Sequence, residues 1–428
     1  TTTIAGPHYF YKRPTNIPSL LLLVTTILLS LRHGHSFSLL PKLRTFSSYH
    51  TTSSSSLLLN VNNIMSAERK SNMKFVDIGA NLLDERFTKG EYFGKVRHDP
   101  DWEQVLQRSV EAGVTHLILT AGTLRESRRA LALVRDLRQK WEEHYNNNAA
   151  VTNKSDEDDN SNMLHFGCTI GVHPTRCQQE FVDRCDPEYK DDATETDLPP
   201  HPNDPQQVLQ ELKALAVEGQ KDQSVCAIGE FGLDYDRLEF CPKEIQQEYF
   251  QKQLQTFQSA PELKDLPLFL HNRNVGRDLA ELLRKEQNAA ACKGVVHSFD
   301  GSIELANEFI EMGLYIGLNG CSLKTEENLQ VVKQIPLDKI LLETDCPYCD
   351  VKATHAGFPF VKTKWESKNY KKFEKGKMVK GRNEPCQIVQ VAEVIAGVKD
   401  VSVETVADAC YANSMALYGF SSSSSSSS

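Results

Sequence analysis

The chain has 428 residues, 40% of them hydrophobic, which is enough for one large domain of α/β-barrel size with insertions. Its formal net charge of −9 argues against a protein that coats nucleic acid nonspecifically, so a polyanionic substrate would need a local basic patch. All eleven cysteines follow residue 167 without compact, even spacing, which indicates reduced thiols rather than a disulfide scaffold.

Residues 1–66 differ in composition from the rest, and no acidic residue precedes Glu68. The apolar run 17–31 resembles the h-region of a signal peptide, and the basic, Ser-rich stretch behind it resembles a transit peptide. If this segment is a targeting signal, we expect an organelle protein of the plastid or mitochondrion. If Met65 is the true start, we expect a cytoplasmic or nuclear protein. The run is too short for a comfortable span, so we expect no stable membrane insertion of the mature domain.

The folded domain is expected at residues 67–420, followed by a Ser-rich tail at 421–428. Apolar runs alternate with helical periodicity along this domain. The expected strands are residues 75–79, 115–120, 166–171, 225–228, 267–271, 294–297, 314–319 and 340–344. The expected helices lie near residues 101–112, 131–141, 208–217, 242–258, 277–285, 303–312, 386–396 and 403–417. Two polar stretches, 146–162 and 183–205, are expected to be insertion loops. Eight strands alternating with helices predict a (β/α)8 TIM barrel, with a doubly wound open sheet as the alternative.

Four of the expected strands end in a residue of metal-ligand type. These residues are Glu230, His271, His297 and Asp345. Each has a simpler interpretation when taken alone, as a hydrogen-bonded core histidine or as a helix cap. Together they favour a metal-dependent active site, because a barrel brings the carboxyl ends of its strands to one mouth, whereas an open sheet spreads them apart. Two imidazoles and two carboxylates suit Mg²⁺, Mn²⁺ or Zn²⁺, and the carboxylates favour the harder ions.

A strongly basic segment, residues 362–382, follows the last strand and contains Trp365, Tyr370 and Phe373. Lysines can neutralise phosphates and aromatic rings can stack on bases of single-stranded DNA, so we expect DNA contact here. The alternative is a solvated loop whose aromatic residues pack against the barrel. Cys346 and Cys349 form a C-P-Y-C motif, but the absence of a second CxxC nearby disfavours redox or zinc chemistry.

Motifs along the whole domain resemble those of the TatD family of metal-dependent deoxyribonucleases, in particular its eukaryotic TatD-domain-containing branch. The matching segments are F-V-D-I-G-A-N-L (75–82), G-V-H-P-T-R-C (171–177), A-I-G-E-F-G-L-D-Y-D-R-L (227–238), F-L-H-N-R (269–273), V-V-H-S-F-D-G (295–301), Y-I-G-L-N-G-C-S-L-K-T-E (315–326), L-L-E-T-D-C-P (341–347), T-H-A-G (354–357) and R-N-E-P-C (382–386). The resemblance implies an amidohydrolase-type barrel that hydrolyses DNA phosphodiesters, chiefly as a 3′→5′ exonuclease. It implies one or two divalent ions, Mg²⁺ or Mn²⁺ in the first place, with Zn²⁺ as the alternative. The implied substrate is single-stranded DNA or DNA 3′ ends, and we expect a monomer.

The resemblance also implies roles for individual residues. Glu230, His271, His297 and Asp345 match the metal ligands, and Glu230 would bridge the ions if two bind. His173 matches a histidine near the scissile phosphate, with a phosphate-positioning or proton-transfer role. Asp345 would orient or deprotonate the attacking water. The expected substrate-binding residues are Asn81, His173, Arg273, Lys364, Trp365 and Arg382, although the R-N-E-P motif that begins at Arg382 could instead fix its loop to the barrel.

The chain departs from the family pattern at several of these positions. Many members begin with an H-x-H pair of extra ligands, where this chain has Gly79 and Asn81. Asn81 offers a neutral amide, so we expect a weaker metal site at the first strand. Phe231 and Asn272 stand where cysteine is usual, and Cys346 replaces an alanine beside a ligand.

Two other functions remain open from the sequence. The same barrel could hydrolyse a non-nucleic-acid ester or amide bond. Loss of the H-x-H pair could also leave a catalytically silent binding protein, which retention of the other four ligand positions disfavours.

Overall fold

The computed structural model describes residues 72–420 apart from 153–162, 187, 190–197 and 287–291, together with residues 64, 67, 69 and 70; the side chains of residues 144–152 are not described. The expected targeting segment, except for Ile64, and the Ser-rich tail lie outside these residues. In the described part of the chain, no helix is long and apolar enough to cross a membrane.

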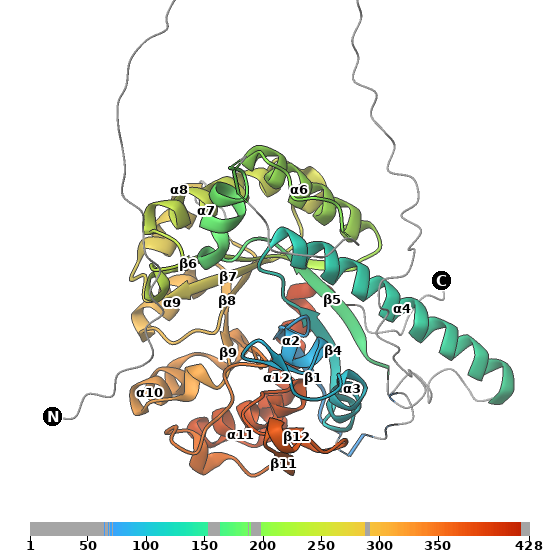
Figure 1. The fold of residues 1–428 in the computed structure, drawn as a ribbon. Coiled ribbons are helices and arrows are strands. Elements are labelled where there is room, and N and C mark those ends of the chain that lie inside the picture. Colours follow the sequence, from blue (N-terminus) through green and yellow to red (C-terminus); the bar gives the residue numbers. More distant parts are fainter. Residues whose placement is uncertain are drawn as a thin grey trace, which may run out of the picture. The chain divides into compact units, whose positions relative to one another are not determined.

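Eight parallel strands form a single sheet that curls into a barrel (Figure 1). In spatial order they are β1 (Phe75–Ala80), β4 (Val114–Leu119), β5 (His165–Ile170), β6 (Val225–Asp234), β7 (Leu268–Arg273), β8 (Gly294–His297), β9 (Leu314–Leu318) and β10 (Ile340–Leu342). The first and last strands meet through a parallel bridge between Ala80 and Cys346 and through the hydrogen bond from Asp345 N to Gly79 O, 2.8 Å. The predicted (β/α)8 barrel is therefore confirmed, and the open sheet is excluded.

Helices connect the strands and cover the outside of the barrel (Figure 1). They are α2 (Glu85–Thr88), α3 (Trp102–Glu111), α4 (Leu124–Thr152), α6 (Pro205–Lys221), α7 (Lys243–Gln258), α8 (Asp278–Glu286), α9 (Ile303–Glu311), α10 (Glu326–Gln334), α11 (Ile388–Lys399) and α12 (Val403–Tyr418). Two boundaries differ from the sequence prediction. Residues 146–152, expected in a loop, continue α4, and β6 runs beyond the apolar run through Glu230 to Asp234.

The apolar core has two parts, as expected from the period-two alternation of barrel strands. Inward-facing residues such as Val76, Ile118, Phe269 and Leu341 fill the barrel interior, where Leu417 of α12 joins them. A larger apolar layer packs between the strands and the surrounding helices. The interior is thus solid below the mouth, which leaves the carboxyl ends of the strands for chemistry.

Two long connections lie side by side at those carboxyl ends, one after β1 and one after β10. The first contains a hairpin of β2 (Glu91–Tyr92) and β3 (Lys95–Val96), and the second contains the pair β11 (Ser367–Lys368) and β12 (Met378–Val379). Arg382 joins them, because its guanidinium donates to both carboxylate oxygens of Asp101 at 2.6 Å and to Glu384 at 2.9 Å.

Candidate metal centre

The four ligand-type residues predicted from the sequence converge because their strands are neighbours in the barrel. β6 and β7 pair with Gly232 beside His271, and β7 and β8 pair with His271 beside His297. Glu230 lies two residues before Gly232 on the same face of β6, so it faces the same mouth. Asp345 follows β10, and its backbone hydrogen bond to Gly79 places it where the barrel closes.

The carboxylate of Glu230 is the centre of the cluster. Its Oε1 atom lies 2.7 Å from His271 Nδ1, 2.7 Å from His297 Nε2 and 3.3 Å from His173 Nε2. The two ligand histidines approach each other as well, with His271 Nδ1 3.0 Å from His297 Nε2. The potential ligand atoms of His173, Glu230 and His271 all lie within 4.8 Å of one another. His173, expected beside the scissile phosphate, therefore also lies within reach of a metal ion.

The groups of the cluster shift one another's pKa values toward an ionised Glu230 beside a protonated His297. Burial alone would raise the pKa of Glu230, but the neighbouring imidazoles of His297 and His173 hold it well below its ordinary value. Burial alone would lower the pKa of His297, but Glu230 and Glu343 raise it well above the ordinary value. Burial raises the pKa of Asp345 to about 6. A buried, ionised carboxylate surrounded by imidazole nitrogens is suited to bind a divalent cation.

Two buried carboxylates that orient the ligand histidines were missed in the sequence. Asp234 Oδ2 lies 3.3 Å from His271 Nε2, and Glu343 Oε2 lies 3.5 Å from His297 Nδ1. Each ligand imidazole thus has a carboxylate on its far nitrogen, the arrangement that fixes the tautomer and orientation of metal-bound histidines. The sequence feature that could have revealed them is the period of two along a strand. Asp234 lies four residues after Glu230, and Glu343 lies two residues before Asp345, so each shares a face with a predicted ligand.

Asp345 is held on both of its oxygens. Asn81 Nδ2 donates to Oδ1 at 2.8 Å, and the Cys349 thiol donates to Oδ2 at 3.2 Å. The amide oxygen of Asn81 accepts from the Thr120 hydroxyl at 2.5 Å. In this arrangement Asn81 presents its amide N–H groups to Asp345 and positions that carboxylate.

The two residues of the C-P-Y-C motif have separate surroundings. The Cys346 thiol is fully buried, and burial raises its pKa well above the ordinary value. The Cys349 thiol is partly buried and donates to the Asp345 carboxylate at 3.2 Å.

The space above Gly79, where many family members carry the first histidine, is filled. A Cβ atom on residue 79 would lie 2.8 Å from Glu343 Oε2. That carboxylate also accepts the backbone N–H of Ser298 and, at 3.2 Å, the side-chain amide of Asn319. The glycine therefore makes room for the carboxylate that orients His297.

The predicted substrate-binding residues have different surroundings. Arg273 is partly exposed, and its guanidinium forms no hydrogen bond or ion pair within the described residues; burial would lower its pKa, but Asp234 and other acidic groups raise it. Arg382 is 1% exposed, and its guanidinium is bound to carboxylates, which matches the loop-fixing alternative rather than contact with a phosphate. Lys364 is exposed, with its amine over the ring of Phe358, and Trp365 packs half-buried against the core.

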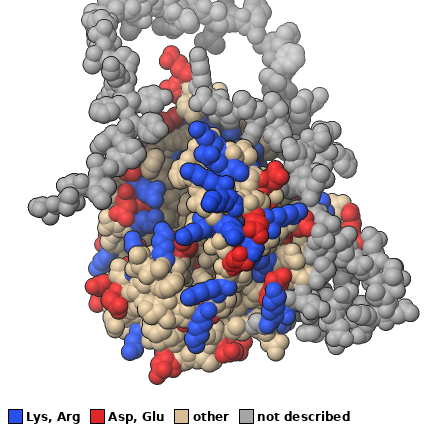
Figure 2. All heavy atoms as spheres, turned by 60° about the horizontal axis from the view of Figure 1, so that its bottom comes forward, with Lys and Arg blue, Asp and Glu red and all other residues tan. Residues whose placement is uncertain are grey.

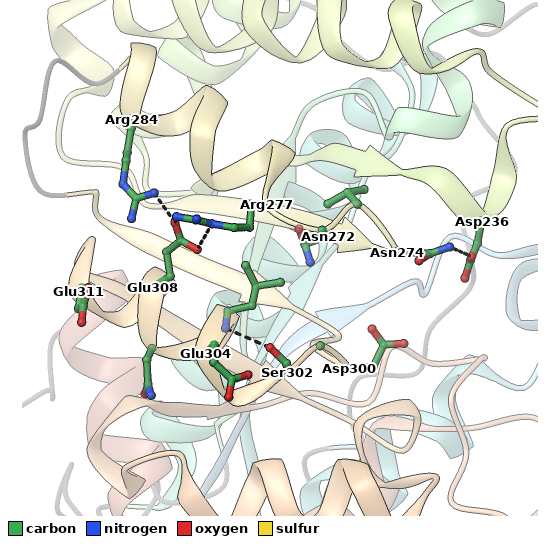
Figure 3. A pocket seen from close by; sticks show the side chains of 15 residues that line it. Asp236, Asn272, Asn274, Arg277, Arg284, Asp300, Ser302, Glu304, Glu308 and Glu311 are labelled. Carbon is green, nitrogen blue, oxygen red and sulfur yellow. Dashed lines mark hydrogen bonds and ion pairs between the residues drawn. The ribbon is translucent and has the colours of Figure 1, made fainter.

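A cavity of about 830 Å³ opens next to this mouth, beyond the carboxyl ends of β7 and β8 (Figure 3). The Asn272 side chain lines it, with a buried amide oxygen that has no hydrogen-bond partner in the part of the chain that the structure describes. Arg277 and Arg284 both point to Glu308 and form ion pairs with it. The acidic residues of the lining are Asp236, Asp300, Glu304, Glu308 and Glu311. Five carboxylates against two arginines make this cavity unsuited to a DNA backbone.

Comparisons with known proteins agree with this geometry. The family described as TatD related DNase matches residues 76–419. A protein of Schizosaccharomyces pombe named Deoxyribonuclease Tat-D is 39% identical over 347 residues, 81% of this chain and 96% of its own length. An uncharacterized metal-dependent hydrolase of Bacillus subtilis is 34% identical over 220 residues, 51% of this chain and 74% of its own. The crystal structure of a TatD family hydrolase from Entamoeba histolytica superposes with a TM-score of 0.65 at 36% identity, covering 81% of this chain and 98% of that one. The chain therefore belongs to the TatD related DNase family, metal-dependent hydrolases that act on ester bonds.

Proposed function

We propose that the protein is a metal-dependent deoxyribonuclease that removes nucleotides from the 3′ ends of DNA, with Mg²⁺ or Mn²⁺ as its cofactor. One observation carries the proposal, namely the convergence of His271, His297 and His173 on the Glu230 carboxylate at the mouth of a TatD-type barrel. The names of the fungal relatives support DNA as the substrate. The 3′→5′ direction and the choice of metal rest on the family resemblance.

Glu230, His271, His297 and Asp345 would hold the metal, and His173 is close enough to join them. When bound, a divalent metal polarises a phosphoryl oxygen and lowers the pKa of a bound water. Asp234 and Glu343 keep the ligand imidazoles in position from the far side. Asp345, oriented by Asn81 and Cys349, accepts the proton of the attacking water. Arg273, whose guanidinium binds no carboxylate among the described residues, takes the substrate phosphate.

The test uses the full chain, stripped of metal, and single-stranded DNA labelled at either end. Mg²⁺, Mn²⁺ or Zn²⁺ is added back, and products are separated on a denaturing gel. We expect a ladder that shortens from the 3′ end, stronger with Mg²⁺ or Mn²⁺ than with Zn²⁺. Glu230→Gln should lower the rate by two or more orders of magnitude, because the atom shared by three imidazoles loses its charge.

Glu393→Gln is the matched control. This buried glutamate accepts from Lys362 N and from the backbone and hydroxyl of Thr363, without contact with the cluster. We expect the Glu393→Gln variant to lose some stability at most and to retain metal-dependent hydrolysis of DNA. Shortening from the 5′ end would contradict the proposed polarity. Metal binding without any cleavage of DNA would contradict the proposed substrate, and a panel of simple esters and amides would follow.

A further inference from the structure

Phe93, at the tip of the β2–β3 hairpin, contributes little to the stability of the fold. The hairpin loop consists of Phe93 and Gly94, with φ angles of 53° and 70°, the signs of a type I′ turn. Asparagine, aspartate or glycine is favoured at the first position, because a bulky side chain is strained there. The Phe93 side chain is 88% exposed, so burial returns little for that strain. A strained, exposed aromatic residue suggests a role in binding.

The hairpin is held rigidly by rings from the basic segment. Tyr92 stacks on Tyr370, with centroids 4.8 Å apart and planes at 8°, and His98 stacks on Phe373 at 4.1 Å and 11°. Tyr370 and Phe373 of the basic segment, expected to stack on DNA bases, therefore stack on protein rings instead, and Trp365 packs against the core. Phe93 lies beside the same scaffold, 6.4 Å from Tyr370, with its ring still exposed.

Positive charge gathers around this hairpin although the whole chain is acidic. We call residues 89–97 and 362–380 together the hairpin lobe. Residues 362–380 contain eight lysines and two glutamates, and residues 89–97 contain two lysines, one arginine and one glutamate. Lys368 and Lys377 pair with the two glutamates of the longer segment, which leaves the remaining lysines to set the charge of its surface. Figure 2 shows Lys and Arg side chains gathered in a band on the face that bears β11 and β12.

The hairpin lobe adjoins the metal centre on the side of Asp345. Its two segments belong to the connections after β1 and β10, which are adjacent where the barrel closes. Tyr348 links the two connections close to the centre, because its N–H donates to Asp345 O at 2.9 Å and its hydroxyl donates to Asp84, in the connection after β1, at 3.0 Å. Arg86 covers the Tyr348 ring at 4.3 Å. A strand of DNA that leaves the centre on this side would therefore pass over the lobe.

We propose that the hairpin lobe binds an unpaired stretch of the DNA substrate, with Phe93 stacked on one base and the lysines around it holding the phosphates. The inference rests on the proposed function and deepens it by naming the surface and the side chain that would hold the single strand. Bases within a duplex already stack on each other, so they have no free face for Phe93. Duplex DNA can use only the lysines.

The first test measures binding without hydrolysis. Fluorescence anisotropy of a fluorescein-labelled single strand, and of the same strand annealed to its complement, is recorded with the full chain in EDTA. Phe93→Ala should weaken single-strand binding roughly five- to hundredfold, the range for one base–aromatic stack, and leave duplex binding within about twofold. Val401→Ala, which removes another exposed apolar side chain at the turn between α11 and α12, should change neither.

The charge component is tested by salt dependence. Lys371→Ser with Lys372→Ser should reduce the slope of log K against log salt by about 1.4, since each single-strand phosphate contact contributes about 0.7. Lys264→Ser with Lys285→Ser removes the same charge from exposed positions outside the lobe and should leave the slope unchanged. Phe93→Trp should retain binding, and its added fluorescence should be quenched by the single strand.

The outcomes separate this proposal from the proposed function. If Phe93→Ala binds the single strand as tightly as the unchanged chain, or loses single-strand and duplex binding equally, the stacking proposal is overturned even where DNA is hydrolysed. If metal-dependent hydrolysis is absent but the binding losses follow the pattern above, the lobe is supported and the nuclease activity is not. With both present, Phe93→Ala should raise KM for single-stranded DNA and leave kcat unchanged.

Discussion

At the scale of single residues, Glu343 connects the ligand His297 to the rest of the barrel. Its carboxylate accepts from Ser298 N and Asn319, and its second oxygen faces the His297 imidazole at 3.5 Å. The residue is fully buried, and a Cβ atom on residue 79 would lie 2.8 Å from its carboxylate. The geometry of the ligand therefore depends on a residue that is not itself one of the predicted ligands.

Glu343→Gln should weaken metal binding about 10- to 100-fold, the usual effect of losing the partner of a metal-bound histidine. Calorimetric titration of Mn²⁺ into the metal-free protein measures it directly. The same buried charge is removed elsewhere by Glu393→Gln, which should leave the Mn²⁺ affinity unchanged. Equal affinities for the Glu343→Gln variant and the unchanged chain would show that Glu343 does not position His297.

At the scale of elements, Arg382 joins the connections after β1 and β10. It donates to Asp101, Glu384 and the carbonyl of Arg86, and Arg108 donates to the other side of Glu384 at 2.8 Å. Burial would lower the pKa of Arg382, but Asp101 and Glu384 raise it above its ordinary value. These contacts hold the connection after β1, which carries Asn81 and the β2–β3 hairpin, against the connection after β10.

Arg382→Met should lower the free energy of unfolding by about 3 kcal/mol, because buried Asp101 loses the guanidinium that binds both of its oxygens and Glu384 keeps Arg108 alone. Urea unfolding measures this loss. Arg273→Met supplies the contrast, since that arginine has no carboxylate bound to it in the described structure. It should raise KM for DNA with little effect on stability. A stable Arg382→Met variant with a raised KM would instead favour the phosphate-binding role for Arg382.

At the scale of the whole molecule, the candidate site lies at the carboxyl end of the barrel strands. A pair of stacked histidines, His116 and His165, lies nearer the amino end. His116 of β4 pairs with His165 of β5 where the two strands begin to pair, and the centroids of their stacked rings are 4.6 Å apart. Phe420 covers the His116 ring on a second contact, also at 4.6 Å. Burial, with smaller effects of His165 and Arg69, lowers the pKa of His116 to about 3.

This buried histidine predicts a loss of stability in mild acid. A folded-state pKa below the unfolded value of about 6.5 means that the unfolded chain binds more protons, so stability falls as the pH drops below that value. Between pH 7 and pH 5 the contribution of His116 to the loss is about 2 kcal/mol. His116→Phe, which retains a stacked ring, should reduce the loss seen in urea unfolding at these two pH values. An unchanged loss would show that His116 is not its source.

Much of the fold could be predicted from the sequence, because each strand is marked by its own residues. Buried parallel strands appear as short apolar runs, and all eight expected strands are present with shifts of one or two residues at most ends. The runs are local, so no contact across the chain was needed to recognise them. The same locality placed Glu230, His271, His297 and Asp345 at strand ends, and the structure brings them to one mouth. Helical periodicity was less clear past residue 145, where polar composition concealed the end of α4.

Only the tertiary structure decided which side chains meet. Asp234 and Glu343 differ little from other strand carboxylates until the pairing of β6 with β7 places Asp234 behind His271 and the pairing of β10 with β9 places Glu343 behind His297. Tyr370 and Phe373 stack on Tyr92 and His98, which lie more than 270 residues earlier in the chain. Propensity and period act over a few residues, whereas the partner of a loop side chain is set by which connections the barrel closure makes adjacent. The sequence alone determined the barrel and its candidate metal ligands, and the packing of the strands and of the connections after β1 and β10 decided which carboxylates face those imidazoles and which aromatic rings remain exposed.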